Sequence, residues 1–314
     1  MYLSVTIPVM DPRILDGAAV ARELRAEAAA GAARLAPRGV VPGLTVVLVG
    51  DDAASTTYVR NKEKAAREAG FAGKTLRFPA SLPEADLLST IDGLNRDCAV
   101  DGILVQLPLP KHVAAARVLE AIDPGKDADG FHPANAGRLL QGKPAPVPCT
   151  PAGILELLKR ERVALRGARA VVVGRSDIVG KPMALLLMQN DATVTVAHSK
   201  TRDLPAVCRE ADLLVAAMGR PGFVTGDFVK EGAVLVDVGI NRIATRADLE
   251  RFFPGDAKRA AVFEKNGSTL VGDCDPVTAY PKASRYTPVP GGVGPLTIAH
   301  LLLNTLRLCE ARRG

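Results

Sequence analysis

The chain contains no tryptophan, and aromatic residues make up only 4% of its 314 positions. It also has no run of more than two consecutive Lys or Arg residues. Surfaces that bind nucleic acids commonly combine a basic stretch with stacking aromatic side chains, so the composition argues against a nucleic-acid partner. The formal net charge of +6 suits anionic ligands, and a solvated basic surface explains it equally well.

Long hydrophobic runs are missing as well. No apolar stretch approaches the ~20 residues that cross a bilayer, and the N-terminal MYLSVTIPVMDPR has no basic segment followed by an apolar core. The five cysteines and four histidines are scattered without metal-ligand or redox spacing. We therefore expect a cytoplasmic protein with reduced thiols, no metal ion and no membrane partner.

What the first half does contain is an alternation of strand and helix patterns. After a helix capped by Asp16 and ending near Leu35, strands are predicted at 44–49, 74–78 and 102–107, with helices at 53–69, 84–95 and 113–122. This alternation predicts an α/β fold with a mostly parallel sheet covered on both faces.

A second α/β run follows a stretch rich in Pro and Gly, 123–151. We place a domain junction near its end, with Thr150 as cap and Pro151 at the first position of a linking helix to about Arg160. Strands predicted at 170–173, 193–197, 213–217 and 233–238 form a four-stranded nucleotide-binding half. One more helix runs to about Cys309.

The stretch AVVVGRSDIVGKP, residues 170–182, opens this second run. A strand, a glycine turn and a helix in succession can hold a phosphate at the helix N-terminus. Only two of the three glycines of the G-x-G-x-x-G pattern are present, Gly174 and Gly180. By itself the stretch therefore fits an ordinary strand-to-helix turn as well as a cofactor site.

The residues after the next strand bear on the choice of cofactor. NAD-preferring folds usually carry an acid there, but TVTVA is followed by His198, Ser199 and Lys200, with no acid until Asp203. A hydroxyl and a base suit a 2′-phosphate, and Arg175 is a second candidate contact. We therefore favour NADP over NAD; the alternative is that these polar groups only cap the following helix.

Several first-domain residues are candidates for chemistry. Tyr58 and Lys62 in YVRNK share one helix face. A buried Lys can exchange protons near neutrality; the alternative is that Lys62 is one more solvated charge on a charged helix. Gln106 ends an apolar strand, where it can meet a ligand or bond the next turn. Asp127 and Asp129 in KDADG are candidate acceptors for a heterocycle, or part of an Asp-Gly turn.

Three prolines and three glycines stand within nine residues in TPVPGGVGP, 287–295. Proline rigidifies such a segment, whereas glycine permits unusual dihedral angles and a close approach of ligand to backbone. A flexible linker seldom combines both, so we favour a binding loop here.

Together these stretches resemble the bifunctional methylenetetrahydrofolate dehydrogenase/cyclohydrolase family. The shared motifs, which cover most of residues 15–305 in the family's order, are YVRNKEKAAREAG, DGILVQLPLP, KDADGFHPANAGRL, PCTPAGILELL, VVVGRSDIVGKPMA, AHSKT, ADLLVAAMGRPGF, VLVDVGINR and TPVPGGVGP. The resemblance implies two α/β domains flanking a cleft, the second a Rossmann-type NADP-binding domain, in a protein that is usually a homodimer.

The resemblance also implies domains at 1–149 and 150–294, with a C-terminal helix, 295–314, returning to the first. It implies oxidation of 5,10-methylenetetrahydrofolate by NADP and hydrolysis of the methenyl product to 10-formyltetrahydrofolate. Lys62 matches the family's catalytic lysine, Tyr58 and Gln106 its neighbours, and Asp129 the residue that holds the pterin. Matching cofactor contacts are Gly174, Arg175, Ser176, Ile178, Val179, Ser199, Gly219 and Ile240, and Gly291, Gly292 and Val293 would line the nicotinamide and the folate.

One segment departs from the family pattern. The chain is longer than usual between Arg242 and Val271, around 245–265, and we expect these residues to lie away from the named motifs and to leave activity intact. Two alternatives remain open. One is a family member with a single activity, and the other is a non-catalytic cofactor-binding scaffold on the same fold.

Overall fold

The structure, a computed structural model, describes residues 11–314. The chain forms two compact units. We call residues 17–163, 175–190 and 294–314 the three-stranded unit, and residues 11–16, 164–174 and 191–293 the five-stranded unit, after their main sheets. None of the helices formed by residues 11–314 is both long enough and apolar enough to cross a membrane.

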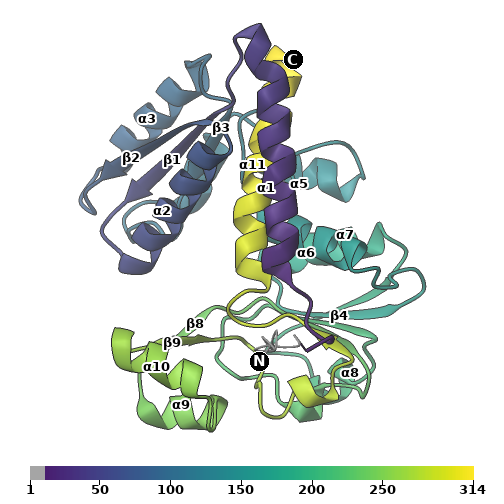
Figure 1. The fold of residues 1–314 in the computed structure, drawn as a ribbon. Helices are drawn as coiled ribbons and strands as arrows, with labels where there is room; N and C mark the ends of the chain where they lie inside the picture. The colour runs from purple at the N-terminus through teal and green to yellow at the C-terminus, as the bar shows by residue number, and fades with distance from the viewer. Residues whose placement is uncertain (1–10) are drawn as a thin grey trace, which may run out of the picture. The chain divides into compact units, whose positions relative to one another are not determined.

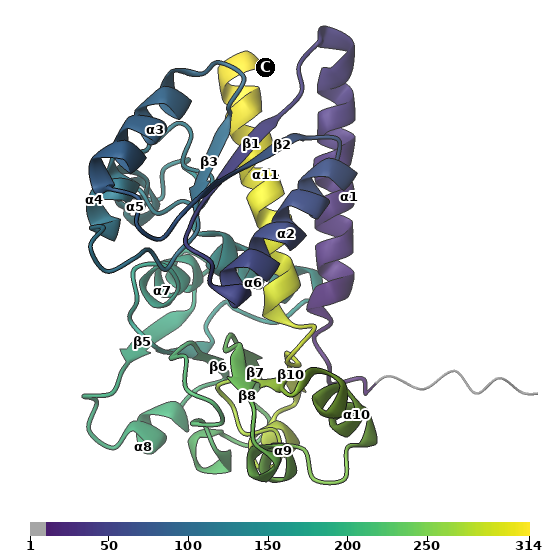
Figure 2. The same ribbon diagram turned by 90° about the vertical axis from the view of Figure 1, so that its left-hand side faces the viewer.

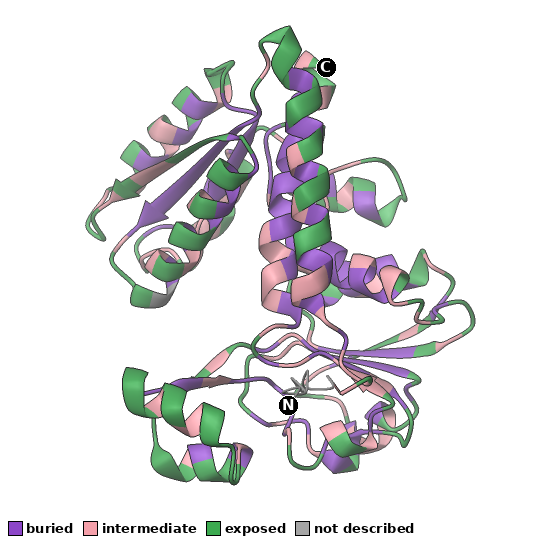
Figure 3. Cartoon of the chain, in the orientation of Figure 1, coloured by how far each residue is buried: buried purple, intermediate pink, exposed green. Residues whose placement is uncertain are grey.

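The three-stranded unit is built on a parallel sheet of order β2-β1-β3, with β1 at Gly43–Val49, β2 at Ala72–Phe78 and β3 at Gly102–Val105. Every residue of β1 is buried, which Figure 3 shows as a continuous purple strand. Its helices are α1 (Gly17–Leu35), α2 (Ala53–Glu68), α3 (Glu84–Arg96), α4 (Ala115–Glu120), α5 (Pro133–Leu140), α6 (Cys149–Arg160), α7 (Gly180–Met188) and α11 (Val293–Arg313, of which only Val293 belongs to the other unit).

Helices cover both faces of this sheet (Figure 2), with α3 and α4 on one face and α11 on the other. Leu87, Ile91 and Val118 from α3 and α4 pack on Val47 and Ile103 of the strands. On the opposite face α11 lies so close to β3 that a side chain at Gly102 would stand 2.9 Å from the Thr305 hydroxyl. The last helix of the chain therefore belongs to the core of this unit.

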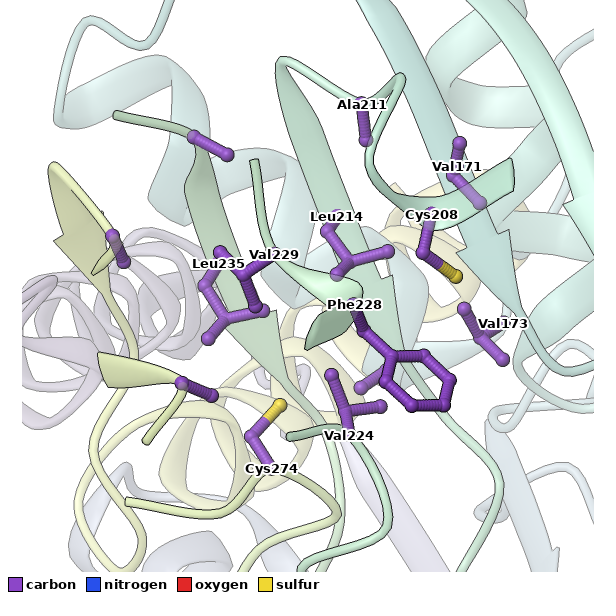
Figure 4. Close-up of a cluster of buried hydrophobic side chains, with 14 of the residues drawn as sticks. Val171, Val173, Cys208, Ala211, Leu214, Val224, Phe228, Val229, Leu235 and Cys274 are labelled. Atoms are coloured by element: carbon purple, nitrogen blue, oxygen red, sulfur yellow. The ribbon is translucent and has the colours of Figure 1, made fainter. Parts of the chain in front are cut away.

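The five-stranded unit has an all-parallel sheet of order β10-β7-β6-β4-β5. Its strands are β4 (Arg169–Val173), β5 (Thr193–Ala197), β6 (Leu213–Ala216), β7 (Val234–Asp237) and β10 (Arg285–Tyr286). Side chains from β4, β6 and β7 meet Phe228 and Val229 in one apolar cluster (Figure 4). A short antiparallel pair, β8 (Asn241–Ile243) and β9 (Thr269–Val271), completes the strands.

The helices of the five-stranded unit are α8 (Leu204–Cys208), α9 (Arg246–Phe252) and α10 (Ala257–Asn266), besides short 3₁₀ turns at Gly226–Phe228 and Tyr280–Lys282. Figure 1 shows α9 and α10 next to β8 and β9, on the side of the unit opposite α8. A further 3₁₀ turn at Ala36–Arg38 follows α1 in the other unit.

The predicted α/β class with parallel sheets is confirmed, and several details differ. The second sheet has five strands rather than four, because the two-residue β10 joins β7. Helix α6 begins at Cys149, preceded by Pro148 in extended conformation, so Thr150 and Pro151 lie inside the helix rather than at its cap and first position. The helix predicted at 113–122 spans only 115–120, and α5 was not predicted.

Candidate active site

Helix α2 places Tyr58 and Lys62 on one face. Asp52 caps the helix by accepting a hydrogen bond from the Ser55 amide at 2.7 Å, which fixes where its turns begin. Lys62 is only 5% exposed, so the alternative of one more solvated charge is wrong. Its Nζ lies 5.1 Å from the centre of the Tyr58 ring, within cation–π range.

Gln106 follows the last residue of β3 and faces Lys62. Its Oε1 accepts a hydrogen bond from Lys62 Nζ at 3.0 Å, and its Nε2 donates to the Leu107 carbonyl at 2.7 Å. The interpretation that Gln106 bonds the following turn is therefore confirmed, and a contact with a ligand stays a prediction. The bond to the turn fixes the amide, and the fixed amide orients the amine.

The ammonium form of Lys62 is disfavoured in this setting. Burial lowers the pKa of Lys62 below its ordinary value, while the negative charge of Asp129 and the nearby Cys149 sulfur partly oppose that shift. A lysine with a lowered pKa carries a larger fraction of neutral amine at neutral pH. That amine can accept a proton.

The two neighbouring aspartates have different roles. Asp127 is buried and its carboxylate accepts bonds from the Gly130 amide, the His132 amide and the Asn135 side chain, at 3.0, 2.8 and 2.9 Å. Asp127 is thus used to form the turn. Burial raises the pKa of Asp129 to about 6, although the Lys62 charge works against this, so Asp129 is the carboxyl in electrostatic contact with the lysine.

The loop that carries Asp129 is held from α11. Asn304 Nδ2 donates to the carbonyls of Ala128 and Val147 at 3.0 and 2.9 Å, and the Cys149 thiol donates to Ala128 at 3.4 Å. Cys149 is buried, and this burial raises the pKa of its thiol well above the ordinary value. Sequence reasoning missed Cys149 because a single cysteine at a helix start carries no spacing pattern.

Tyr58 borders a basic hollow of about 440 Å³. Burial raises the pKa of Tyr58 to about 12, and its hydroxyl donates to the Gly294 carbonyl at 3.4 Å. The hollow is lined by Ala18, Arg22, Arg25, Tyr58, Asn61, Lys64, Ala65, Glu68, Gly294, Pro295 and Ile298. Arg22 and Arg25 were not predicted; their spacing of three on one helix face was the available signal.

Four cofactor candidates lie between β4 and α7, in the three-stranded unit. Ser176 Oγ accepts hydrogen bonds from the amides of Val179 and Gly180 at 3.2 and 3.3 Å, so it closes the turn that starts α7. Arg175 and Ile178 are exposed. An exposed guanidinium and an exposed apolar side chain beside a helix start fit the phosphate and the ring systems of a dinucleotide.

The other cofactor candidates belong to the five-stranded unit. Gly174 has a φ of +136°, and a Cβ there would stand 2.2 Å from the Ala217 carbonyl oxygen, so only glycine fits. Asp273 accepts from the amides of Met218, Gly219 and Arg220 at 2.7–2.9 Å and so forms the turn at Gly219. Ile240 is 52% exposed, which is unusual for an isoleucine and leaves an apolar surface for a ligand.

Ser199 is exposed and does not cap the following helix. That role falls to Asp203, which accepts from the Ala206 amide at 3.3 Å. The alternative that the AHSKT residues cap α8 is therefore wrong for Ser199. Its hydroxyl has a solvent-facing position.

The TPVPGGVGP loop is rigidly held at its start. Thr287 Oγ1 accepts from the Asp237 amide at 2.7 Å and donates to the Asp237 carbonyl at 3.2 Å. Gly291 has a φ of +106°, and a Cβ at Gly292 would stand 2.6 Å from the Pro288 carbonyl oxygen. Val293 is only 4% exposed. The loop needs both glycines, and Pro290 between its two halves is exposed.

Within residues 11–314, no group of three His, Cys, Asp or Glu side chains is arranged to hold a metal ion. The chain combines a buried lysine–amide–carboxyl cluster with a parallel α/β unit whose glycine turns are of the dinucleotide-binding type. These features define an α/β protein equipped for proton transfer and nucleotide binding.

Comparison with known proteins identifies the family. The model of the tetrahydrofolate dehydrogenase/cyclohydrolase catalytic domain matches residues 15–129, and the model of the NAD(P)-binding domain of the same family matches residues 148–313. The chain therefore belongs to the tetrahydrofolate dehydrogenase/cyclohydrolase family, as its motifs predict.

Individual relatives match over nearly the whole chain. The bifunctional protein FolD of Koribacter versatilis is 58% identical over 301 residues, 96% of this chain and 98% of the relative. The solved bifunctional enzyme FolD of Campylobacter jejuni is 42% identical, with a TM-score of 0.86 over 95% of this chain and 99% of that one. The Trypanosoma brucei dehydrogenase-cyclohydrolase, solved with NADP and an inhibitor, is 39% identical with a TM-score of 0.85, over 96% and 98% of the two chains.

Proposed function

We propose that this protein is a bifunctional folate enzyme. It oxidises 5,10-methylenetetrahydrofolate to the 5,10-methenyl compound with NADP and then hydrolyses that compound to 10-formyltetrahydrofolate. The observation that carries the proposal is the buried Lys62, bonded to Gln106 and electrostatically coupled to Asp129. Membership of the family and relatives named as bifunctional FolD support it.

NADP, when bound, accepts the hydride of the first reaction. The residues of this chain handle the proton of the second. A water that attacks the cationic methenyl carbon becomes acidic as the new C–O bond forms, and the neutral amine of Lys62 takes its proton. A cationic folate beside Lys62 disfavours the ammonium form further, because like charges repel.

Gln106 and Tyr58 prepare the lysine for this step. The Gln106 carbonyl oxygen accepts from Nζ at 3.0 Å and so directs the amine lone pair. The Tyr58 ring, 5.1 Å from Nζ, offers a face that stabilises the lysine once it is protonated. Both effects favour the transfer of one proton to one atom, Lys62 Nζ.

The folate itself would be held at two places in the three-stranded unit. Asp129 is the acceptor for the amino and ring N–H groups of the pterin. At the other end, folates carry an anionic glutamate, and the hollow lined by Arg22, Arg25 and Lys64 beside Tyr58 provides cations for its carboxylates.

NADP is the cofactor assigned to the glycine turns, with Arg175 and Ser199 as candidates for its 2′-phosphate. The exposure of both side chains supports this assignment. Replacing Arg175 with Ala should weaken NADP binding by about tenfold, the effect of losing one charge-assisted bond, and NAD binding much less. Equal losses for the two dinucleotides, measured by fluorescence titration, would contradict the role of Arg175.

We further assign residues 1–149 with 295–314 to the folate-binding domain and residues 150–294 to the NADP-binding domain, and we propose a cytoplasmic homodimer. The two family models leave residues 130–147 between them, which supports a junction near residue 149. The return of residues 295–314 is supported by their place in the three-stranded unit, which also contains α6 and α7. The open edge of β5, with Val196 41% exposed, is a surface that a second copy can cover. Sedimentation equilibrium tests the dimer, which a monomeric mass would exclude.

The test of the function is a coupled assay on 5,10-methylenetetrahydrofolate that follows NADPH formation and the decay of the methenyl product separately. Lys62→Met should lower hydrolysis by about a hundredfold or more, the usual contribution of a general base, while tetrahydrofolate still binds. Arg67→Met, an exposed change near the end of the same helix, serves as the control.

The same assay separates the alternatives. Hydrolysis that survives in Lys62→Met would contradict the role of the lysine as base. Hydride transfer without hydrolysis, or the reverse, in the unmodified protein would identify a member with one activity. Absence of both, with no stabilisation by NADP in a thermal-shift test, would indicate the scaffold.

A further inference from the structure

The extra segment of this chain is the tip of a long hairpin. Strands β8 and β9 pair antiparallel, with Asn241 opposite Val271 and Ile243 opposite Thr269. Helices α9 and α10 fill the connection between them (Figure 2). No residue of α10 is buried, and Figure 3 shows this helix largely exposed, so few apolar contacts hold it in place.

Phe252 is the first residue that holds this hairpin to the rest of the five-stranded unit, close to the turn at Gly219. Phe252, at the end of α9, is 2% exposed and packs with Ile243 and Val271. A Cβ at Gly222 would stand 2.1 Å from the Phe252 ring. The ring therefore lies directly against the AMGRPGF stretch. The expectation that the extra residues lie away from the named motifs is wrong, because the aromatic side chain of α9 needs this apolar surface.

The second residue that holds the hairpin is Arg259 in the first turn of α10. Its guanidinium donates to the Leu270 carbonyl at 3.1 Å and also to the Val289 carbonyl, and it lies over the Phe253 ring at 4.4 Å. Burial lowers the pKa of Arg259, yet an arginine remains charged at neutral pH. A charged donor to a neutral carbonyl is among the stronger hydrogen bonds.

The carbonyl that Arg259 holds belongs to the TPVPGGVGP loop. Val289 is 7% exposed and precedes Gly291 by two residues. Behind it lies a cavity of about 200 Å³, lined by Phe253, Asp256, Arg259, Val271, Gly272, Pro276, Tyr280, Tyr286, Pro288 and Val289. Packing on this side of the loop is therefore incomplete, and Arg259 contacts the Val289 carbonyl beside this space.

We propose that Arg259 is a positioning residue that holds the Val289 backbone and thereby sets the placement of Gly291 and Gly292. The inference rests on the proposed function, in which this loop lines the nicotinamide and the folate. The largely exposed helix α10 thus supports the binding loop. Arg259 acts through the loop and contacts no reacting atom.

Three variants test the role: Arg259→Met, which keeps the stem but loses the donors, Arg259→Lys, which keeps one charged donor, and Lys258→Met, an exposed neighbouring change. For Arg259→Met we expect the dehydrogenase KM for NADP or folate to rise by about tenfold, as for one lost charged hydrogen bond. We expect kcat at saturation to change little, Arg259→Lys to recover part of the loss, and Lys258→Met to match the unmodified protein.

Hydrogen–deuterium exchange of the loop provides the second readout. In Arg259→Met the amides of residues 291–293 should exchange faster, while those of β7 keep their rates. Unchanged KM values with unchanged loop exchange would overturn the proposal. So would an activity loss that only follows the loss of folded protein, with KM unaltered.

The two readouts also separate this proposal from the proposed function. If the unmodified protein oxidises no methylenetetrahydrofolate, the function fails, and loop exchange in Arg259→Met still decides whether the arginine positions the loop.

Discussion

Asp127 and Asp129 stand two residues apart in one loop and meet different surroundings. Three donors bind the carboxylate of Asp127, whereas burial beside Lys62 raises the pKa of Asp129. The sequence KDADG contains no information on which carboxyl receives the Asn135 amide, because that bond depends on how α5 packs. From the residues alone both carboxyls therefore remained candidates, and the family resemblance was what selected Asp129.

In its proposed role as the pterin acceptor, Asp129 should make substrate binding depend on pH. Because its pKa is raised to about 6, the carboxyl becomes protonated as the pH falls below 6 and loses its charge as a pterin acceptor. We expect the Kd of tetrahydrofolate to rise by about tenfold per pH unit below that value, measured by calorimetric titration from pH 5 to 8. Asp129→Asn should bind more weakly and show a flat profile; a slope that persists in this variant would assign the titration elsewhere.

The raised pKa of Asp129 affects the free energy of unfolding in the opposite direction from substrate binding. A raised carboxyl pKa means that the folded protein holds this proton more tightly than the unfolded chain does. The contribution of Asp129 to stability is therefore fully present below pH 4 and is lost as the pH rises through 6. Binding and stability respond to Asp129 in opposite directions, as expected of a group retained for function rather than for folding.

At the scale of elements, the turn at Gly219 depends on one carboxylate from a distant segment. Asp273 is fully buried and accepts from three successive amides of the turn and from Asn241. Asp273→Asn replaces one acceptor oxygen with a donor that faces other donors. We expect a loss of about 2–4 kcal/mol in unfolding free energy and a higher Kd for NADP.

Thermal denaturation with and without NADP measures this effect. Asp227→Asn, at an exposed position in the same unit, is the matched control and should change neither quantity. If Asp273→Asn retained the melting temperature and the NADP affinity, the turn would be held by its backbone alone.

Elements were predictable where apolar periodicity was long. The strand at 44–49 and the helices at 53–69 and 84–95 were found within one or two residues. The two helices bury one face over several turns, and the strand is a continuous apolar run with every residue buried. The two residues of β10 were missed, since Arg285 and Tyr286 become a strand only by pairing with β7. The predicted cap of α6 was wrong for a similar reason. Pro148 precedes the helix, although Thr150 is the better capping residue by type.

At the scale of the whole molecule, α11 closes the three-stranded unit. Its Asn304 bonds the loop before Asp129, and its C-terminal Arg312 and Arg313 pair with the fully buried Asp101. Asp101 also accepts from the Gly43 amide at 2.9 Å. One carboxylate thus joins α11 to the start of β1.

Removing the Asp101 carboxylate should destabilise the packing of α11 against the rest of the three-stranded unit. We expect Asp101→Ala to lower the unfolding free energy of this unit by about 2–4 kcal/mol, because two cations and an amide lose their partner. Arg96→Gln, which removes the exposed Arg96–Asp92 pair, should cost less than about 1 kcal/mol. Urea denaturation followed by circular dichroism compares the two, and equal effects would show that the buried pairing adds nothing.

The dependence on α11 also has a consequence for biosynthesis. During synthesis a chain leaves the ribosome with its N-terminus first, so β4–β10 of the five-stranded unit emerge before α11 does. The sheet of the three-stranded unit, on which the Lys62-bearing helix α2 packs, therefore lacks the cover of α11 until nearly the entire polypeptide has been made. A nascent chain stopped at residue 293 should hold a folded nucleotide-binding half and a catalytic half still dependent on chaperones.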